Sequence, residues 1–121
     1  MARILVVDDS PTDVAYLKNV LSKAGHEVIE ASSGQDAITQ VRERHPDCIV
    51  MDVVMPGVNG FQATRTLSKS PDTAHIPIIV VSSKSQETDR LWAMRQGAKD
   101  YIVKPLRDSE LLSKVGDVLG H

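Results

Sequence analysis

The sequence predicts an α/β domain, in which a parallel β-sheet is covered by helices on both of its faces. Short β-rich runs alternate with amphipathic stretches of helical spacing along the 121 residues. Three of the runs are apolar on both sides, which is typical of strands that are buried on both faces of a sheet. The length fits one domain, and no linker, low-complexity segment or internal repeat divides the chain. We therefore expect a single domain over residues 1–121.

The predicted strands differ in polarity, and this difference predicts their order in the sheet. Strands one, three and four are apolar on both sides and should be central, whereas strand two carries Glu27 and Glu30 and strand five is short and flanked by polar residues. This pattern favours a flavodoxin-like (βα)5 doubly wound parallel sheet with strand order 2-1-3-4-5 over the six-stranded Rossmann order. In chain order, the strands are predicted at Ile4–Val7, Glu27–Ala31, Cys48–Met51, Ile78–Val81 and Asp100–Val103.

Each predicted strand is followed by a stretch with the apolar spacing of a helix. The first helix begins at Ser10-Pro11-Thr12-Asp13, which offers a capping serine, a proline at the first helical position and an acid at the third, and Gly25 ends it. Its apolar face is predicted to contain Val14, Leu17, Val20, Leu21 and Ala24. The other helices are predicted around Gln35–Glu43, after Gly60, over about Gln86–Gln96 and over about Ser109–Leu119.

Composition excludes several classes of protein. The 14 basic and 16 acidic residues give a net charge of −2, without the basic stripe expected of a nonspecific nucleic-acid binder. The single cysteine excludes an internal disulfide framework. No apolar run approaches the roughly 18 residues that span a bilayer, and Asp8 and Asp9 interrupt any apolar region of a signal peptide. We expect a cytoplasmic protein that binds neither nucleic acid nor membrane.

Chemically active side chains follow the strands at the points where the strands end. Because parallel strands bring their carboxyl ends to one edge of the sheet, we expect these side chains to meet there: Asp8, Asp9, Asp52, Ser82, Ser83 and Lys104. Three carboxylates in one cleft repel one another unless they are protonated or neutralised. A hard divalent cation such as Mg²⁺ would neutralise them, since it prefers oxygen ligands and keeps several waters.

This edge of the sheet also offers what an incoming phosphoryl group needs, namely a nucleophile, positive charge and hydrogen-bond donors. Asp52 is the candidate nucleophile, as carboxylates are in aspartyl-phosphate chemistry. Asp8 and Asp9 would hold the metal, and Lys104 and Ser82 would bind the phosphoryl oxygens. No histidine, cysteine or second general base is needed.

Four segments of the chain resemble the receiver domain of bacterial two-component response regulators, in particular the chemotaxis type. The segments VVDDSP, MDVVMPGVNG, IIVVSS and DYIVKP occur in the family's order and spacing, so the resemblance covers essentially the whole chain. It implies that Asp52 accepts the phosphoryl group, that Asp9 binds Mg²⁺ directly and that Asp8 acts through a metal-bound water. It also implies that the backbone carbonyl of Val54 is a further metal ligand beside these acids.

The same resemblance implies roles for residues at the ends of strands four and five. Ser82, rather than the adjacent Ser83, matches the switch hydroxyl, because its spacing to Lys104 is that of the family. Lys104 matches the phosphate-binding lysine, with a cis bond to Pro105. Tyr101 matches the switch aromatic, although on its pattern alone it could be a half-packed residue of an edge strand.

The resemblance implies a signalling switch that takes a phosphoryl group from a sensor histidine kinase and catalyses its own phosphorylation and dephosphorylation. Phosphorylation would draw Ser82 inward, let Tyr101 rotate toward the core, and change the binding face formed by helix four, strand five and helix five. Trp92 on helix four is either a partner contact, with Tyr101 on the same face, or a packing residue.

Within the family, the segments MARILVVDDSPTD, MPGVNGFQATR and RQGAKDYIVKP are most similar to stand-alone regulators of type IV pilus twitching motility. This similarity implies a monomer without an output domain, which acts on a downstream protein such as the pilus motor machinery. The domain could instead drain phosphate from a shared kinase. A receiver that binds its partner without phosphorylation is a further alternative, but the key positions are intact.

Two alternatives of other classes can be weighed on particular residues. An aspartate-nucleophile phosphatase would need a second acid two residues after its nucleophile, where this chain has Val54. A flavin carrier would need an aromatic side chain to stack on the flavin, and none is obviously so placed among Tyr16, Phe61, Trp92 and Tyr101.

Overall fold

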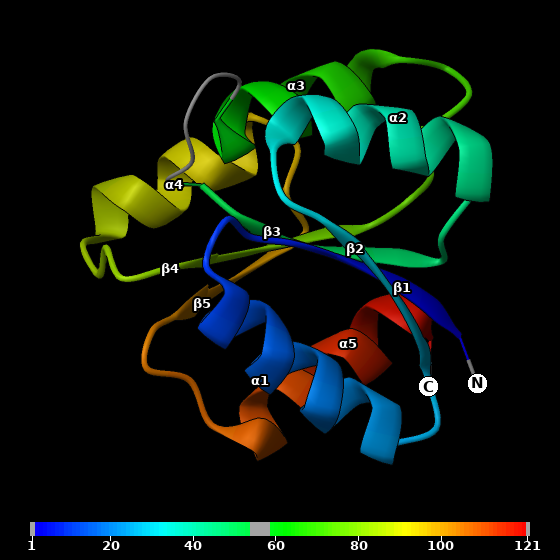
Figure 1. The fold of residues 1–121 in the computed structure, drawn as a ribbon. Coiled ribbons are helices and arrows are strands. Elements are labelled where there is room, and N and C mark those ends of the chain that lie inside the picture. The colour runs from blue at the N-terminus through cyan, green and yellow to red at the C-terminus, as the bar shows by residue number, and fades with distance from the viewer. Residues whose placement is uncertain (1, 54–58, 121) are drawn as a thin grey trace.

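The computed structural model of the protein describes residues 2–53 and 59–120. Within these residues, five parallel strands form one sheet in the order β2-β1-β3-β4-β5, so the predicted strand order is confirmed (Figure 1). The strands are β1 (Arg3–Val7), β2 (Glu27–Ala31), β3 (Cys48–Asp52), β4 (Ile78–Ser82) and β5 (Asp100–Val103). The helices are α1 (Pro11–Lys23), α2 (Gly34–Arg44), α3 (Gly60–Lys69), α4 (Glu87–Arg95) and α5 (Asp108–Leu119).

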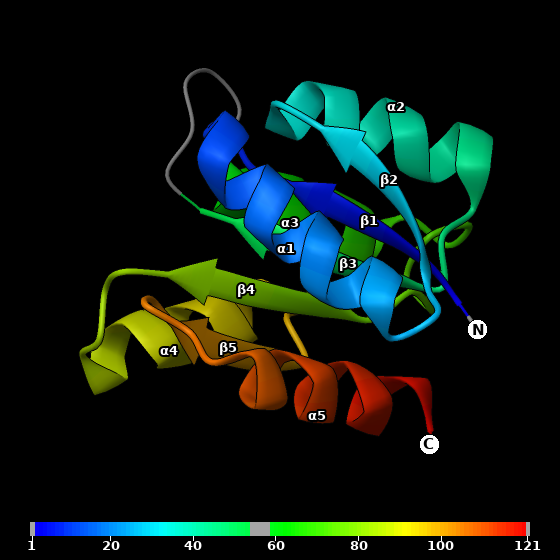
Figure 2. The same ribbon diagram turned by 60° about the horizontal axis from the view of Figure 1, so that its bottom comes forward.

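Two apolar layers, one on each face of the sheet, hold the helices in place. Helices α2, α3 and α4 pack on one face, over strand residues such as Leu5 and Met51. Helices α1 and α5 pack on the other face, over residues such as Val6 and Val50. Figure 1 shows these two groups of helices on opposite sides of the sheet, and Figure 2 brings α1 and α5 forward. Among the helices of the described residues, none has the length and apolarity to cross a bilayer.

The sheet has a buried centre and two partly exposed edges. Every residue of β3 and β4 is buried, as expected for the inner strands of a parallel sheet. Strand β2 exposes Glu27 and Glu30 at one edge, and β5 exposes Val103 at the other. Cys48 opens β3 and is fully buried, and burial raises the pKa of its thiol to about 12, so the thiol stays protonated.

The predicted start of the first helix is confirmed. Ser10 Oγ accepts a hydrogen bond from the backbone N–H of Asp13 at 3.4 Å, and Pro11 is the first helical residue. Gly25 follows the helix end with a φ of +95°, a conformation that favours glycine. The prediction that Ala24 belongs to the apolar face is wrong. Ala24 is exposed because it is the C-cap residue, one position beyond the last helical residue Lys23, so the helical spacing no longer places it on the apolar face.

Candidate functional site

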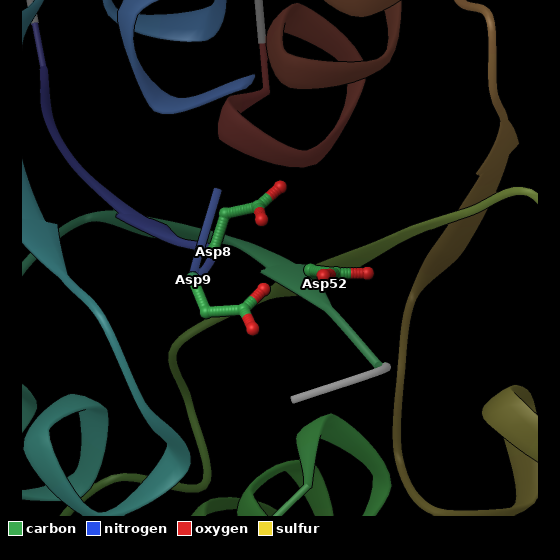
Figure 3. Close-up of side chains that lie close together, drawn as sticks. All are labelled: Asp8, Asp9 and Asp52. Carbon is green, nitrogen blue, oxygen red and sulfur yellow. The ribbon is translucent and has the colours of Figure 1, made fainter. Parts of the chain in front are cut away.

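Three carboxylates meet at the edge of the sheet where β1 and β3 end. Asp8 and Asp9 directly follow β1, and Asp52 is the last residue of the neighbouring strand β3. Since Val7 pairs with Met51 in the parallel register, the residues that follow these two lie at the same level. Each acid offers one carboxylate oxygen within 4.8 Å of those of the other two. Figure 3 shows Asp8 and Asp9 leaving β1 in different directions, with Asp52 beside them.

The three acids differ in exposure and in hydrogen bonding. Asp8 is 2% exposed and Asp52 is 8% exposed, whereas Asp9 faces solvent. Both oxygens of Asp8 accept hydrogen bonds, Oδ1 from the backbone N–H of Ser10 at 3.0 Å and Oδ2 from the ammonium of Lys104 at 3.2 Å. These contacts lower the cost of burying the charge of Asp8. Three like charges this close together still repel, so the cluster attracts positive charge.

Lys104 is the cation that the segment after β5 brings to these acids. Its Nζ lies 3.2 Å from Asp8 Oδ2 and 3.0 Å from Asp13 Oδ2, in the first turn of α1. Burial disfavours the charged form of Lys104, but the hydrogen bond to Asp13 and the charges of Asp52 and Asp8 together outweigh it. The pKa of the ammonium therefore lies above its usual value. The peptide bond between Lys104 and Pro105 is cis, as the resemblance implies.

The candidate switch residues Ser82 and Tyr101 meet at the same piece of backbone. Ser82 ends β4 and is buried, whereas Ser83 is exposed. Ser82 Oγ accepts a hydrogen bond from the backbone N–H of Lys84 at 3.1 Å. The hydroxyl of Tyr101 donates to the carbonyl of Lys84 at 2.8 Å. Tyr101 is 6% exposed, so it is a buried residue in this structure and not a half-packed one.

Trp92 combines the two roles that the sequence leaves open. It is 51% exposed on α4, and the neighbouring Leu91 is exposed as well. Its ring and that of the partly buried Phe61 of α3 form an edge-to-face pair, with ring centroids 6.5 Å apart and planes at 79°. Trp92 therefore joins α4 to α3 and also offers apolar surface to solvent.

Two residues at the site are not identified by the sequence reasoning. Gly60, the first residue of α3, lies so close to the end of β3 that a β-carbon would fall 2.0 Å from the carbonyl oxygen of Asp52. Asp13 is recognised in the sequence only as an acid of the first helical turn. Its contact with Lys104 depends on how the segment after β5 folds over α1, which no local pattern reveals. Val54, whose backbone carbonyl the resemblance implies as a metal ligand, lies outside the described residues.

The set of donor atoms suits a hard divalent cation. Carboxylate oxygens are the ligands that Mg²⁺ prefers in proteins, and three of them converge here. Two of the acids, Asp8 and Asp52, are nearly buried, so solvent screens their repulsion poorly. Lys104 carries a single positive charge and is already paired with Asp8 and Asp13, so it does not neutralise the whole cluster. The residues present therefore fit a magnesium ion.

The family comparison covers almost the whole chain. Residues 4–116 match the family model of the response regulator receiver domain. The chain is 51% identical to protein PilH of Pseudomonas aeruginosa over 119 residues, which are 98% of this chain and 98% of PilH.

Solved structures agree in fold. A putative response regulator from Chloroflexus aurantiacus has a TM-score of 0.95 and 32% identity, with 99% of this chain and 98% of that one covered. The receiver domain of a sensor histidine kinase from Pseudomonas aeruginosa, solved with a magnesium ion coordinated in its active-site cleft, has a TM-score of 0.91 and 27% identity, with coverage of 99% and 98%. The chain belongs to the response regulator receiver domain family of two-component signalling.

Proposed function

We propose that this protein is a phosphoryl-accepting switch, in which Asp52 takes a phosphoryl group from a sensor histidine kinase in the presence of Mg²⁺. The observation that carries the proposal is the convergence of three carboxylates within 4.8 Å beside the Lys104 ammonium. Such a cluster has an excess of negative charge and a cation placed to receive an anion.

Asp8, Asp9 and Asp52 would hold the magnesium ion, with the backbone carbonyl of Val54 as a further ligand. A bound magnesium ion supplies positive charge that offsets the acids and the phosphoryl oxygens. The magnesium ion in the kinase receiver domain from Pseudomonas aeruginosa supports this assignment, because that domain shares the fold of this chain.

Asp52 is the proposed nucleophile because it occupies the position of the family's phosphoacceptor, at the end of β3. The two oxygens of Asp8 accept hydrogen bonds from the Ser10 backbone and from Lys104. In the transfer, a carboxylate oxygen of Asp52 forms a bond to phosphorus while the phosphorus–nitrogen bond of the donor's phosphohistidine breaks. The departing imidazole takes a proton from water. Lys104 and Ser82 donate hydrogen bonds to the phosphoryl oxygens as the charge on them changes.

The contacts of Lys84 suggest how phosphorylation reaches the surface. The Ser82 hydroxyl would leave the Lys84 amide to donate to a phosphoryl oxygen, and the backbone of Lys84 would then be free to move. Tyr101 would move with it, because its hydroxyl is bonded to the carbonyl of the same residue. The face of α4, β5 and α5, where Trp92 is exposed, would change its affinity for a downstream protein.

We also propose that the protein acts as a monomer in a pilus-related pathway and that the pilus motor machinery is its downstream target. Identity of 51% to PilH over nearly the full length of both chains supports a shared role. A pull-down with and without beryllofluoride, an anionic mimic of the phosphoryl group, would test the proposed downstream target. A protein captured only with beryllofluoride supports the switch, whereas no difference between the two samples argues for a phosphate sink.

The direct test of the chemistry uses Mg²⁺ and a small acyl phosphate, with the modified residue located by mass spectrometry. We expect one labelled aspartate, Asp52, and no label after Asp52→Asn. The matched control is Asp117→Asn, which removes an exposed acid from α5 and should leave the labelling intact. Label that persists in Asp52→Asn would exclude Asp52 as the phosphoacceptor.

A further inference from the structure

Lys104 is held by two acids that differ in their surroundings. Its Nζ lies 3.2 Å from Asp8 and 3.0 Å from Asp13. The Asp8 side chain is 1% exposed and also accepts from the backbone of Ser10, whereas the Asp13 side chain is 44% exposed. Asp13 is well solvated when its partner leaves, and Asp8 is not. The contact with Asp13 is therefore the one that Lys104 can give up at low cost.

Two contacts of neighbouring residues keep Asp13 beside Lys104. The hydroxyl of Ser10 caps the backbone N–H of Asp13. One helical turn further along, the hydroxyl of Tyr16 donates to the carboxylate of Asp108 at the start of α5, which ties α1 to the segment that carries Lys104. Asp13, Tyr16 and Lys104 also line an open hollow of about 490 Å³, so solvent reaches the pair.

A phosphoryl group on Asp52 would compete for the same ammonium. It adds negative charge next to Lys104, while Asp13 holds Lys104 toward α1. We propose that Asp13 is a positioning residue that binds the Lys104 ammonium in the unphosphorylated protein and competes with the phosphoryl group for it. This inference rests on the proposed function, because it assumes that Asp52 carries the phosphoryl group.

The competition predicts opposite effects of Asp13→Asn on the two ligands of the site. Without Asp13, Lys104 has one acid partner fewer and turns to the anion more readily. Beryllofluoride should therefore bind about two- to fivefold more tightly at saturating Mg²⁺, as expected from losing a partly exposed ion pair. Mg²⁺ alone should bind more weakly, because the charge of Lys104 then offsets Asp8 and Asp52 more fully. General damage to the site would weaken both.

The matched control is Asp36→Asn. Asp36 occupies the same position in α2, where the hydroxyl of Ser33 caps its backbone N–H, and it therefore tests the loss of a capped first-turn acid without contact to Lys104. Asp36→Asn should bind beryllofluoride as the parent does, and Asp13→Glu, which restores the charge, should return binding toward the parent value.

The experiment titrates the full chain with Mg²⁺, and then with beryllofluoride at saturating Mg²⁺, by calorimetry. Tighter beryllofluoride and weaker Mg²⁺ binding in Asp13→Asn supports the inference. Unchanged or weaker beryllofluoride binding in Asp13→Asn, with normal binding in the parent, overturns the inference and leaves the proposed function intact. A parent that binds no beryllofluoride, or an Asp52→Asn variant that still binds it, overturns both.

Discussion

The amino and carboxyl ends of the sheet both carry acidic and basic side chains, but the charges are balanced only at the amino end. At the amino end, Glu27 lies 3.3 Å from Arg3 and 3.9 Å from Arg44, and the carboxylate of Asp47 accepts from the backbone of Arg3. Glu27, Arg44 and Asp47 are exposed and Arg3 is partly buried, and the four side chains balance in charge. At the carboxyl end, Lys104 pairs with Asp8 and Asp13 beside a cluster of three acids, of which Asp8 and Asp52 are nearly buried.

The difference between the ends shows where the fold tolerates unfavourable electrostatics. Exposed ion pairs at the amino end cost little and contribute little, as is usual at a protein surface. Buried like charges at the carboxyl end should destabilise the metal-free protein. The proposed function explains their presence, because they would bind a cation and accept a phosphoryl group.

The largest effect is expected from crowding the carboxyl end. A β-carbon in Gly60→Ala would lie 2.0 Å from the carbonyl oxygen of Asp52, so α3 must move away from β3, at a cost of about 3 kcal/mol of unfolding free energy. The control is Gly116→Ala in α5, where a β-carbon meets nothing within 4 Å. The control should be neutral or stabilised by up to about 1 kcal/mol, because alanine favours a helix. Chemical denaturation measures both, and equal stabilities would contradict the close approach.

An intermediate effect is expected from removing the cation at each end. Lys104→Met leaves the buried Asp8 without its partner, and we expect a loss of about 2 kcal/mol without Mg²⁺, discounted because Lys104 is 23% exposed. Addition of Mg²⁺ should recover part of it. Arg3→Met should lose less than about 1 kcal/mol, with no dependence on Mg²⁺, because the side chains of Arg3 and Glu27 are 40% and 46% exposed and lie at the opposite end of the sheet. Thermal unfolding of both variants with and without Mg²⁺ measures the difference. Equal losses of stability, or the same response to Mg²⁺ in both variants, would contradict the contrast between the two ends.

The sequence predicts the fold well because the burial of each strand is reflected in the polarity of its residues. Strands that are apolar on both sides are central, and the glutamates of β2 mark an edge. The sequence predicts the ends of the helices less accurately than the strand order. Gln86 and Gln96, predicted as the ends of the fourth helix, are its caps, and Ala24 lies beyond the first helix. Apolar spacing does not reveal where the chain leaves the helix axis.

The candidate site is predicted in part, for a related reason. Parallel strands bring their carboxyl ends to one edge, so the meeting of Asp8, Asp9 and Asp52 follows from the strand order. Contacts made by loops and side-chain rotation do not follow from it. Two such contacts are the ion pair of Asp13 with Lys104 and the hydrogen bond from the Tyr101 hydroxyl to the Lys84 carbonyl. Both depend on tertiary packing between distant segments.

The smallest change in stability, and the most direct test of the central claim, comes from one exposed acid. Asp9→Asn removes repulsion from the cluster without disturbing the core, so the metal-free protein should gain about 0.5 kcal/mol of unfolding free energy. The same variant should bind Mg²⁺ at least about tenfold more weakly, because it lacks the charged side chain that we propose as a direct ligand.

The measurement is a calorimetric Mg²⁺ titration of the parent and of Asp9→Asn, paired with denaturation of both without metal. Weaker Mg²⁺ binding together with equal or greater metal-free stability is the result we predict. Unchanged Mg²⁺ affinity, or a loss of metal-free stability in Asp9→Asn, would contradict the claim that the acids at the carboxyl end of the sheet serve a cation at the expense of the fold.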